Sequence, residues 1–354
     1  MKKCIISILI FTLTACQNNT IKDSEEEQSQ EQRNQEQEQI YEIINEKIIV
    51  GKGTEWELNG LLTLPKDIEG KIPAVVLVHG SGPQDMNETV YENKPFLEIA
   101  EYLTTNGIAV IRYDKRTFTH WAKMAQQFGG SLTMYEETIE DAILATKILK
   151  SDQRIDENRV YILGHSLGGS LAPRIHASGG DYAGLILFAG TPRSLIEVIA
   201  DQQVLYYTET MEEGEELNAI LSSADSSVEQ QITGILNMID EEAKNIDAGS
   251  GISLYYYKDN LINLTEKYIK DITVPFLVMH ADNDFQVFTD KDFAMYKELL
   301  SNHSNVTFKL YEGLNHFFMP STVTRSIDIQ DEYKTKFNID KQVLQDIVTW
   351  IKAN

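Results

Sequence analysis

One serine, in the segment YILGHSLGGS at residues 161–170, has the surroundings of an activated nucleophile. Ser166 stands between Gly164 and Gly168 in the pattern Gly-x-Ser-x-Gly. The apolar residues before the pattern predict a strand and those after it predict a helix, and a sharp strand-to-helix turn lifts such a serine above a sheet. Glycines suit this turn because larger side chains would clash where backbone segments cross. The pattern predicts a nucleophile at Ser166, and a glycine-rich turn with a bystander serine is the alternative.

A serine hydroxyl needs a base to take its proton and a carboxylate to orient that base. After a serine of this pattern, the acid and then the histidine follow in the sequence. His316, in GLNHFF, is the predicted base because it follows the last predicted strand. The segment HADNDFQV offers two acids, Asp282 and Asp284, and the residues alone leave both open. Most of the other histidines are interpreted as packing or surface residues, and the side chain of His165 is expected to point away from the serine.

The tetrahedral intermediate of acyl transfer needs hydrogen-bond donors for its oxyanion. The backbone N–H of Leu167, directly after the nucleophile, is one predicted donor. The loop HGSGP at residues 79–83 ends an earlier predicted strand, in the position that supplies the second N–H. Together, these features predict a serine hydrolase whose chemistry needs no metal and no cofactor.

The elements that must position these residues alternate along the chain. The segment IIVGKGTEWELNGLLTLP predicts an opening hairpin. Short apolar runs predict buried strands, and helix-like segments lie between them; the runs are PAVVLVHG, IAVIRYD, RVYILGH, GLILFAG, PFLVMHA and NVTFKLYEG. This alternation predicts an α/β fold with a mostly parallel central sheet flanked by helices. The loops that carry Ser166, the acid and His316 then share one edge of the sheet.

A long interval without a buried-strand run separates GLILFAG from PFLVMHA. It contains helix-like segments, and an insertion of this length is more consistent with helices than with a loop. We predict a helical cap at about residues 191–272, inserted between the sixth and seventh strands. The hydrolase domain that contains it is predicted to span residues 40–354.

The first fifteen residues predict a lipoprotein signal peptide. Lys2 and Lys3 precede the apolar run CIISILIFTLTA, which is too short to span a bilayer as a mature helix. The segment LTAC resembles a bacterial lipobox, in which the cysteine, here Cys16, is lipidated and becomes the mature N-terminus. Two or more acyl chains are enough for stable anchoring. We therefore expect an extracytoplasmic protein that is lipid-anchored to the bacterial cell membrane.

Residues 16–39 have almost no apolar side chains and a strong bias to Glu and Gln. Such a segment cannot bury enough surface to offset the entropy of ordering, so a disordered spacer is predicted. The chain has a formal net charge of −23 and no basic cluster, which argues against nucleic acid as a partner. Apart from Cys16, the only cysteine is Cys4 in the predicted signal, so no disulfide or cysteine nucleophile is expected after its removal.

The ordered set of segments resembles the α/β-hydrolase family, and within it bacterial carboxylesterases of the EstD type. The resemblance covers about residue 45 to the end, through VLVHGSGPQD, NKPFLEIAEYL, GIAVIRYDKRT, ILGHSLGG, FLVMHADNDFQV and YEGLNHFFM. It implies that Ser166 is the nucleophile, Asp284 the acid and His316 the base, and that Ser81 is the donor in the HGSGP loop. It also implies a small-molecule ester or other acyl substrate that is cleaved through an acyl-enzyme intermediate.

Other activities remain open from the sequence. A serine peptidase of the aminopeptidase or prolyl-oligopeptidase-like kind would need cap carboxylates to bind a substrate amine, and TMEEGEELN offers Glu212, Glu213, Glu215 and Glu216. A thioesterase is also possible, because a triad does not choose among acyl substrates. A non-catalytic surface binding protein would be favoured by the loss of a triad residue, and none is lost. The segment QDMNET and the cap sequence depart from the relatives, which leaves the shape of the pocket open.

Overall fold

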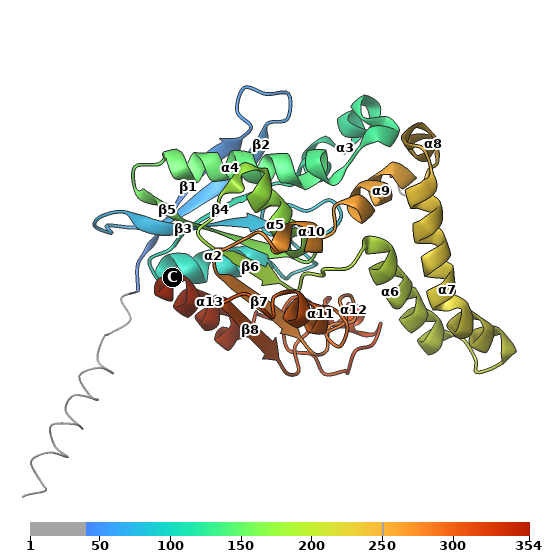
Figure 1. Cartoon of the computed structure of the whole chain (residues 1–354). Coiled ribbons are helices and arrows are strands. Elements are labelled where there is room, and N and C mark those ends of the chain that lie inside the picture. The colour runs from blue at the N-terminus through green and yellow to red at the C-terminus, as the bar shows by residue number, and fades with distance from the viewer. Residues whose placement is uncertain (1–39, 250) are drawn as a thin grey trace, which may run out of the picture. The chain divides into compact units, whose positions relative to one another are not determined.

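The structure is a computed structural model that describes residues 40–249 and 251–354 (Figure 1). The predicted signal peptide, Cys16 and the predicted spacer lie outside the described residues. Among the residues that are described, no helix has both the length and the apolar character needed to cross a membrane.

An eight-stranded sheet forms the centre of the fold, in the order β1-β2-β4-β3-β5-β6-β7-β8. β1 (Ile43–Val50) and β2 (Leu58–Pro65) form the predicted antiparallel hairpin, and β2 is also antiparallel to β4 (Ala109–Tyr113). Every further pair is parallel, through β3 (Ile72–Val78), β5 (Ile155–His165), β6 (Leu185–Phe188), β7 (Phe276–Ala281) and β8 (Val306–Tyr311). The prediction of a mostly parallel sheet is confirmed.

The central strands are mostly apolar, as expected for strands with both faces covered. All residues of β3, β4, β6 and β7 are buried. Successive side chains of a strand point to opposite faces. In β3, Ala74 and Val76 accordingly pack into one apolar core, whereas Val75 and Leu77 pack into the other.

Helices cover both faces of the sheet (Figure 1). On one face, α2 (Pro95–Thr105) and α13 (Lys341–Ala353) bury apolar residues in one core. On the other, α4 (Glu140–Ser151), α5 (Leu167–Ile175) and α11 (Asp292–Leu299) contribute to the second core. The layered arrangement agrees with the predicted fold class.

Between β6 and β7 the chain leaves the sheet and forms a helical cap, as predicted (Figure 1). Its helices are α6 (Leu195–Thr210), α7 (Glu215–Asn237), α8 (Asp240–Asn245), α9 (Leu254–Ile262) and α10 (Glu266–Ile269). Ser194 begins α6 through a capping box with Glu197, which satisfies N–H groups that lack an intrahelical acceptor. Ile196, Ile235 and Leu261 join α6, α7 and α9 in a small apolar cluster.

Several short elements were not predicted from the sequence. The longest is α3 (Arg116–Gln127), which has a kink at His120 and buries few apolar side chains, Met124 among them. The others are 3₁₀ and π-helical turns and α12, at Gly129–Ser131, Tyr135–Ile139, His176–Gly180 and Ile329–Glu332.

Candidate active site

Ser166 lies at the turn between β5 and α5, in a backbone conformation that is rare for a residue with a side chain. Its φ is 53° and its ψ is −117°. Strain of this kind costs on the order of 1–3 kcal/mol and persists only where the surroundings enforce it. The Ser166 N–H donates to the carbonyl of Phe188 in β6 (2.9 Å), and the Ser166 carbonyl accepts from the N–H of Ser170 (3.0 Å). The turn is therefore fixed from both the sheet and the helix.

The two glycines of the motif are required by close backbone contacts. A Cβ at Gly164 would lie 2.1 Å from the carbonyl oxygen of Gly168. A Cβ at Gly168 would lie 2.2 Å from the carbonyl oxygen of Val78 in β3. Real Cβ atoms do not approach backbone so closely, so any larger residue would displace the turn that carries Ser166.

His316 and Asp284 meet on the loops that follow β8 and β7. The His316 Nδ1 lies 2.6 Å from Asp284 Oδ2, and both side chains are buried. The other carboxylate oxygen of Asp284 accepts from the N–H groups of Gln286 (2.7 Å) and Val287 (2.9 Å). A carboxylate that accepts these bonds leaves the proton on Nδ1, so Nε2 is the nitrogen that can act as a base.

The second candidate acid, Asp282, has another partner. Its Oδ1 accepts from the N–H of Gly313 (2.7 Å). The structure therefore brings Asp284, and not Asp282, together with His316. The loop around the histidine is fixed by Asn315, whose side-chain oxygen accepts from the N–H of Phe317 (3.0 Å) and of Met319 (3.2 Å).

The HGSGP loop passes directly beside the serine. A Cβ at Gly80 would lie 3.2 Å from the Cβ of Ser166. The Gly80 carbonyl accepts from Lys115 Nζ (2.8 Å), and this bond helps to fix the loop. Leu167 is the first residue of α5, and the N–H of a first helical residue has no acceptor within its helix. Ser81, Ser166 and Leu167 line the same cavity.

A cavity of about 810 Å³ is lined by Ser81, Ser166, Leu167 and His316 together with side chains of the cap. Its apolar lining includes Phe118, Trp121, Leu195, Val198 and Tyr257. In the described part of the chain, no hydrogen bond joins the Ser166 hydroxyl to His316. Such bonds in ligand-free enzymes are often long and tighten only when substrate binds.

Comparisons with known proteins identify the family of this chain. Residues 72–206 match the serine aminopeptidase S33 family, and residues 240–353 match the dienelactone hydrolase family. Esterase EstD from Thermotoga maritima is 36% identical over 310 residues, which are 88% of this chain and 68% of EstD. The chain belongs to the α/β-hydrolase family that includes EstD.

Solved structures share the fold of this hydrolase. Est1E from Butyrivibrio proteoclasticus has a TM-score of 0.52 and 16% identity, and the match covers 87% of this chain and 99% of Est1E. An esterase from Pyrococcus furiosus has a TM-score of 0.51 and 14% identity, over 96% of this chain and 95% of the other. At such low identity the likeness shows the fold alone.

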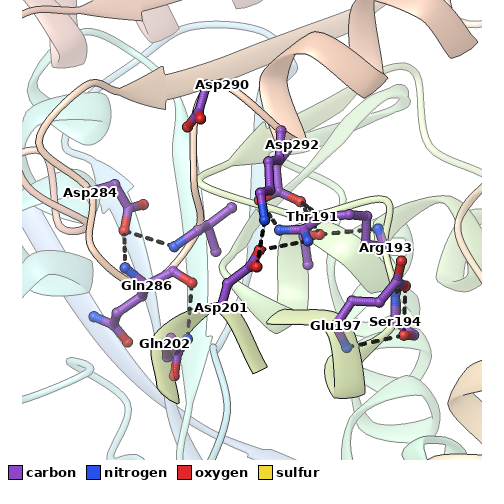
Figure 2. A network of polar contacts seen from close by, with 12 residues as sticks. Thr191, Arg193, Ser194, Glu197, Asp201, Gln202, Asp284, Gln286, Asp290 and Asp292 are labelled. Atoms are coloured by element: carbon purple, nitrogen blue, oxygen red, sulfur yellow. Dashed lines mark hydrogen bonds and ion pairs between the residues drawn. The ribbon is translucent and has the colours of Figure 1, made fainter. Parts of the chain in front are cut away.

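In this α/β-hydrolase, the cap contacts the loop that carries Asp284. Gln202 of α6 donates to the carbonyl of Gln286 (2.9 Å), whose own N–H donates to Asp284 (Figure 2). This chain of bonds connects α6 to the carboxylate that holds His316.

A second contact between the cap and the sheet domain is ionic. Arg193 donates two hydrogen bonds to Asp292 of α11 (2.8 Å each) and one to Asp201 of α6 (2.7 Å) (Figure 2). Thr191 also donates to Asp292, at 2.5 Å. Asp292 is fully buried, so these donors compensate for its removal from water.

The histidines outside the Asp284 pair differ in their surroundings. His79 is buried, with Nε2 3.0 Å from the Asp85 carbonyl, and burial lowers its pKa to about 4. Burial likewise lowers the pKa of His280 to about 4, and this ring packs against Phe293. Both lie in the interior as packing residues.

Two buried pairs of side chains at the cavity were not predicted from the sequence. His165 lines the cavity and contacts the carboxylate of Glu88 (3.0 Å). Lys115 forms a buried ion pair with Glu137 (2.6 Å), which also accepts from the hydroxyl of Tyr256 in α9. The only sequence signals were an acidic residue shortly after HGSGP and a Lys directly after the strand IAVIRYD.

The bond between Gln202 and Gln286 predicts that α6 helps to position Asp284. Replacing Gln202 with Leu removes the donor while keeping a similar shape. Loss of one neutral hydrogen bond is worth about 0.5–1.5 kcal/mol, so kcat on an ester is expected to fall roughly 2- to 10-fold. The neighbouring Gln203 is exposed, and Gln203→Leu is the matched control. Equal kcat values for the two variants would contradict the role of Gln202.

Proposed function

We propose that this protein is a serine carboxylesterase in which Ser166 is the nucleophile, His316 the base and Asp284 the residue that orients the base. The observation that carries the proposal is the buried Asp284–His316 hydrogen bond of 2.6 Å beside a serine held in a strained turn. Ser166 and His316 line the same cavity, which has room for a small ester. The membership in the EstD family supports an ester as substrate.

The proposed reaction begins when the Ser166 oxygen attacks the acyl carbonyl of the ester. His316 takes the serine proton on Nε2, and Asp284 stabilises the resulting imidazolium without taking a proton itself. The backbone N–H groups of Ser81 and Leu167 donate to the oxyanion of the tetrahedral intermediate. When the intermediate collapses, the bond to the alcohol oxygen breaks and His316 gives its proton to the departing alcohol.

Water then cleaves the acyl-enzyme by the same steps in reverse order. His316 takes a proton from water as the water oxygen attacks the acyl carbon, and the same two N–H groups receive the second oxyanion. The bond to the Ser166 oxygen breaks, the serine regains a proton from His316, and the carboxylic acid leaves. No metal and no cofactor takes part in any of these steps.

The position of the cap carboxylates favours an ester over an aminopeptidase substrate. Glu212 and Glu213, between α6 and α7, and Glu215 and Glu216, at the start of α7, are exposed, and none is among the described residues that line the cavity. An aminopeptidase needs a carboxylate near the scissile bond to bind the substrate amine. The two carboxylates that do line the cavity, Glu88 and Glu137, are paired with His165 and Lys115.

We also propose that Cys16 is lipidated and holds the enzyme at the bacterial cell membrane. Lys2 and Lys3, the short apolar run and the LTAC segment support the proposal. Cells grown with an alkyne-tagged fatty acid are expected to transfer the tag to the full chain but not to a Cys16→Ser variant. Equal tagging of both, or of neither, would contradict it.

The proposed nucleophile predicts a specific loss of activity. The wild-type chain is expected to hydrolyse p-nitrophenyl butyrate, a neutral ester suited to a cavity lined by no described Lys or Arg side chain. Removal of a triad member typically reduces kcat by about 10⁴-fold or more, so Ser166→Ala is expected to approach background. The exposed Ser222→Ala, on α7, is the control. Retained hydrolysis in Ser166→Ala would exclude the proposed nucleophile.

A further inference from the structure

A second carboxylate–histidine pair lies next to the proposed triad, where the His165 ring packs against the His316 ring. Glu88 is 1% exposed in a loop where its φ is 52°, and His165 is 2% exposed at the end of β5. The His165 Nδ1 lies 3.0 Å from Glu88 Oε1. Neither residue takes part in the reaction steps given above, although both line the cavity.

The hydrogen-bond partners of His165 favour a proton on each ring nitrogen. Its Nε2 lies 3.1 Å from the backbone carbonyl of His316, and a carbonyl only accepts. Its Nδ1 faces Glu88 Oε1, which also accepts from the N–H of Gly80 (3.0 Å). A carboxylate oxygen can accept from both Gly80 and Nδ1, so these contacts are best satisfied when Nδ1 donates as well. The arrangement favours an imidazolium that is paired with a carboxylate.

The charges around the pair favour the same state. Burial alone would lower the pKa of His165, but the charge of Glu88 and its hydrogen bond, with Asp284 further away, raise it above the ordinary value of 6.5. Burial would raise the pKa of Glu88, but His165, with a smaller contribution from His79, lowers it. Within the described part of the chain, Oε2 of Glu88 has no hydrogen-bond partner, so the imidazolium is the main compensation for its charge.

The pair connects the three loops that the proposed reaction needs. Glu88 holds the N–H of Gly80, the residue directly before Ser81 in the oxyanion loop. His165 directly precedes Ser166 in the chain and holds the carbonyl of His316. Each of these bonds fixes backbone rather than a reacting atom, so the pair acts by positioning.

We propose that Glu88 and His165 form a charged positioning pair that fixes the HGSGP loop and the loop of His316 relative to Ser166. Turnover requires this pair in its ionised state. The inference rests on the proposed function, because it assigns the pair to the same site. Small displacements of reacting groups, of about 1 Å, can cost about 100-fold in rate.

The direction of the pH dependence follows from the two shifts. Because folding raises the pKa of His165, the protonated ring contributes stability that is fully present below pH 6.5. This stability is lost as the pH rises through the raised pKa. Because folding lowers the pKa of Glu88, the carboxylate contributes stability that is fully present above pH 4.5. This stability is lost as the pH falls through the lowered pKa. The pair is thus ionised between the lowered pKa of Glu88 and the raised pKa of His165, and on the alkaline side it is lost as His165 loses a proton.

The variant Glu88→Gln tests the pair, because it keeps the shape and removes the charge. Without the carboxylate, burial favours the neutral imidazole, which leaves one of its two bonds unmade. We expect kcat on p-nitrophenyl butyrate to fall roughly 10- to 100-fold with little change in KM, and the alkaline limb of the kcat profile to move to lower pH. Wild-type kcat and an unmoved alkaline limb in Glu88→Gln would overturn the proposal.

Glu98→Gln is the matched control. Glu98 lies on α2, accepts from the N–H of Ile339 (2.9 Å), and has one buried oxygen without a partner in the described chain, as Glu88 has. It lies outside the cavity lining, so wild-type kcat and an unchanged pH profile are expected. A similar loss in both variants would mean that any partly buried carboxylate matters, and would overturn the specific role of the pair.

A measurement on the wild-type chain tests whether His165 is charged, even if Glu88→Gln does not fold. Nitrogen-15 NMR of the histidine rings, with the His165 signal identified by its absence from His165→Gln, reports protonation directly. Over a pH titration, both nitrogens of His165 are expected to keep their protons to a higher pH than those of a free histidine. Loss of the His165 proton at the same pH as in a free histidine, or at a lower one, would overturn the proposal. Activity retained in Ser166→Ala would instead refute the proposed function and leave the charge state of His165 as measured.

Discussion

The site depends on a contact between backbone segments that is closer than any side chain would allow. At the turn after β5, the positions of Gly164 and Gly168 leave no room for a Cβ, and Ser166 takes a strained conformation between them. The turn can be this tight because the parallel sheet places β3 and β6 on either side of β5. The same strand order brings the ends of β7 and β8 to this edge, so Asp284 meets His316, which lines the same cavity as Ser166.

Around this turn, buried charges are compensated in pairs. Asp284 has His316 and two backbone N–H groups, Glu88 has His165, and Glu137 has Lys115. A buried carboxylate without such a partner would be strongly unfavourable, so each pair constrains the loops that carry it. Lys115 and Glu88 both bind Gly80, which means that the HGSGP loop is held through its carbonyl and its N–H. The cavity is therefore lined by charged side chains of these pairs on the side of the sheet domain and mostly by apolar side chains on the side of the cap.

The sequence predicted those features that depend on local pattern. The buried strands could be predicted because both faces are covered, and the turn at Ser166 because its glycines have no substitute. The acid could not be chosen from the residues, since Asp282 and Asp284 share one loop and only the fold separates their partners. The link between Glu88 and His165 spans 77 residues and depends on a loop with positive φ, so no local pattern indicates it. The assignment of the triad itself stays a prediction.

The central claim is that Asp284 orients His316 to activate Ser166, and the pair of variants Asp284→Asn and Asp282→Asn tests it most directly. An amide at Asp284 favours the wrong histidine tautomer, and kcat on p-nitrophenyl butyrate is expected to fall about 10⁴-fold. An amide at Asp282 still accepts from Gly313, so a change of no more than about threefold is expected. Folding of both variants is checked by thermal unfolding. A large loss in Asp282→Asn, with Asp284→Asn close to wild type, would contradict the account.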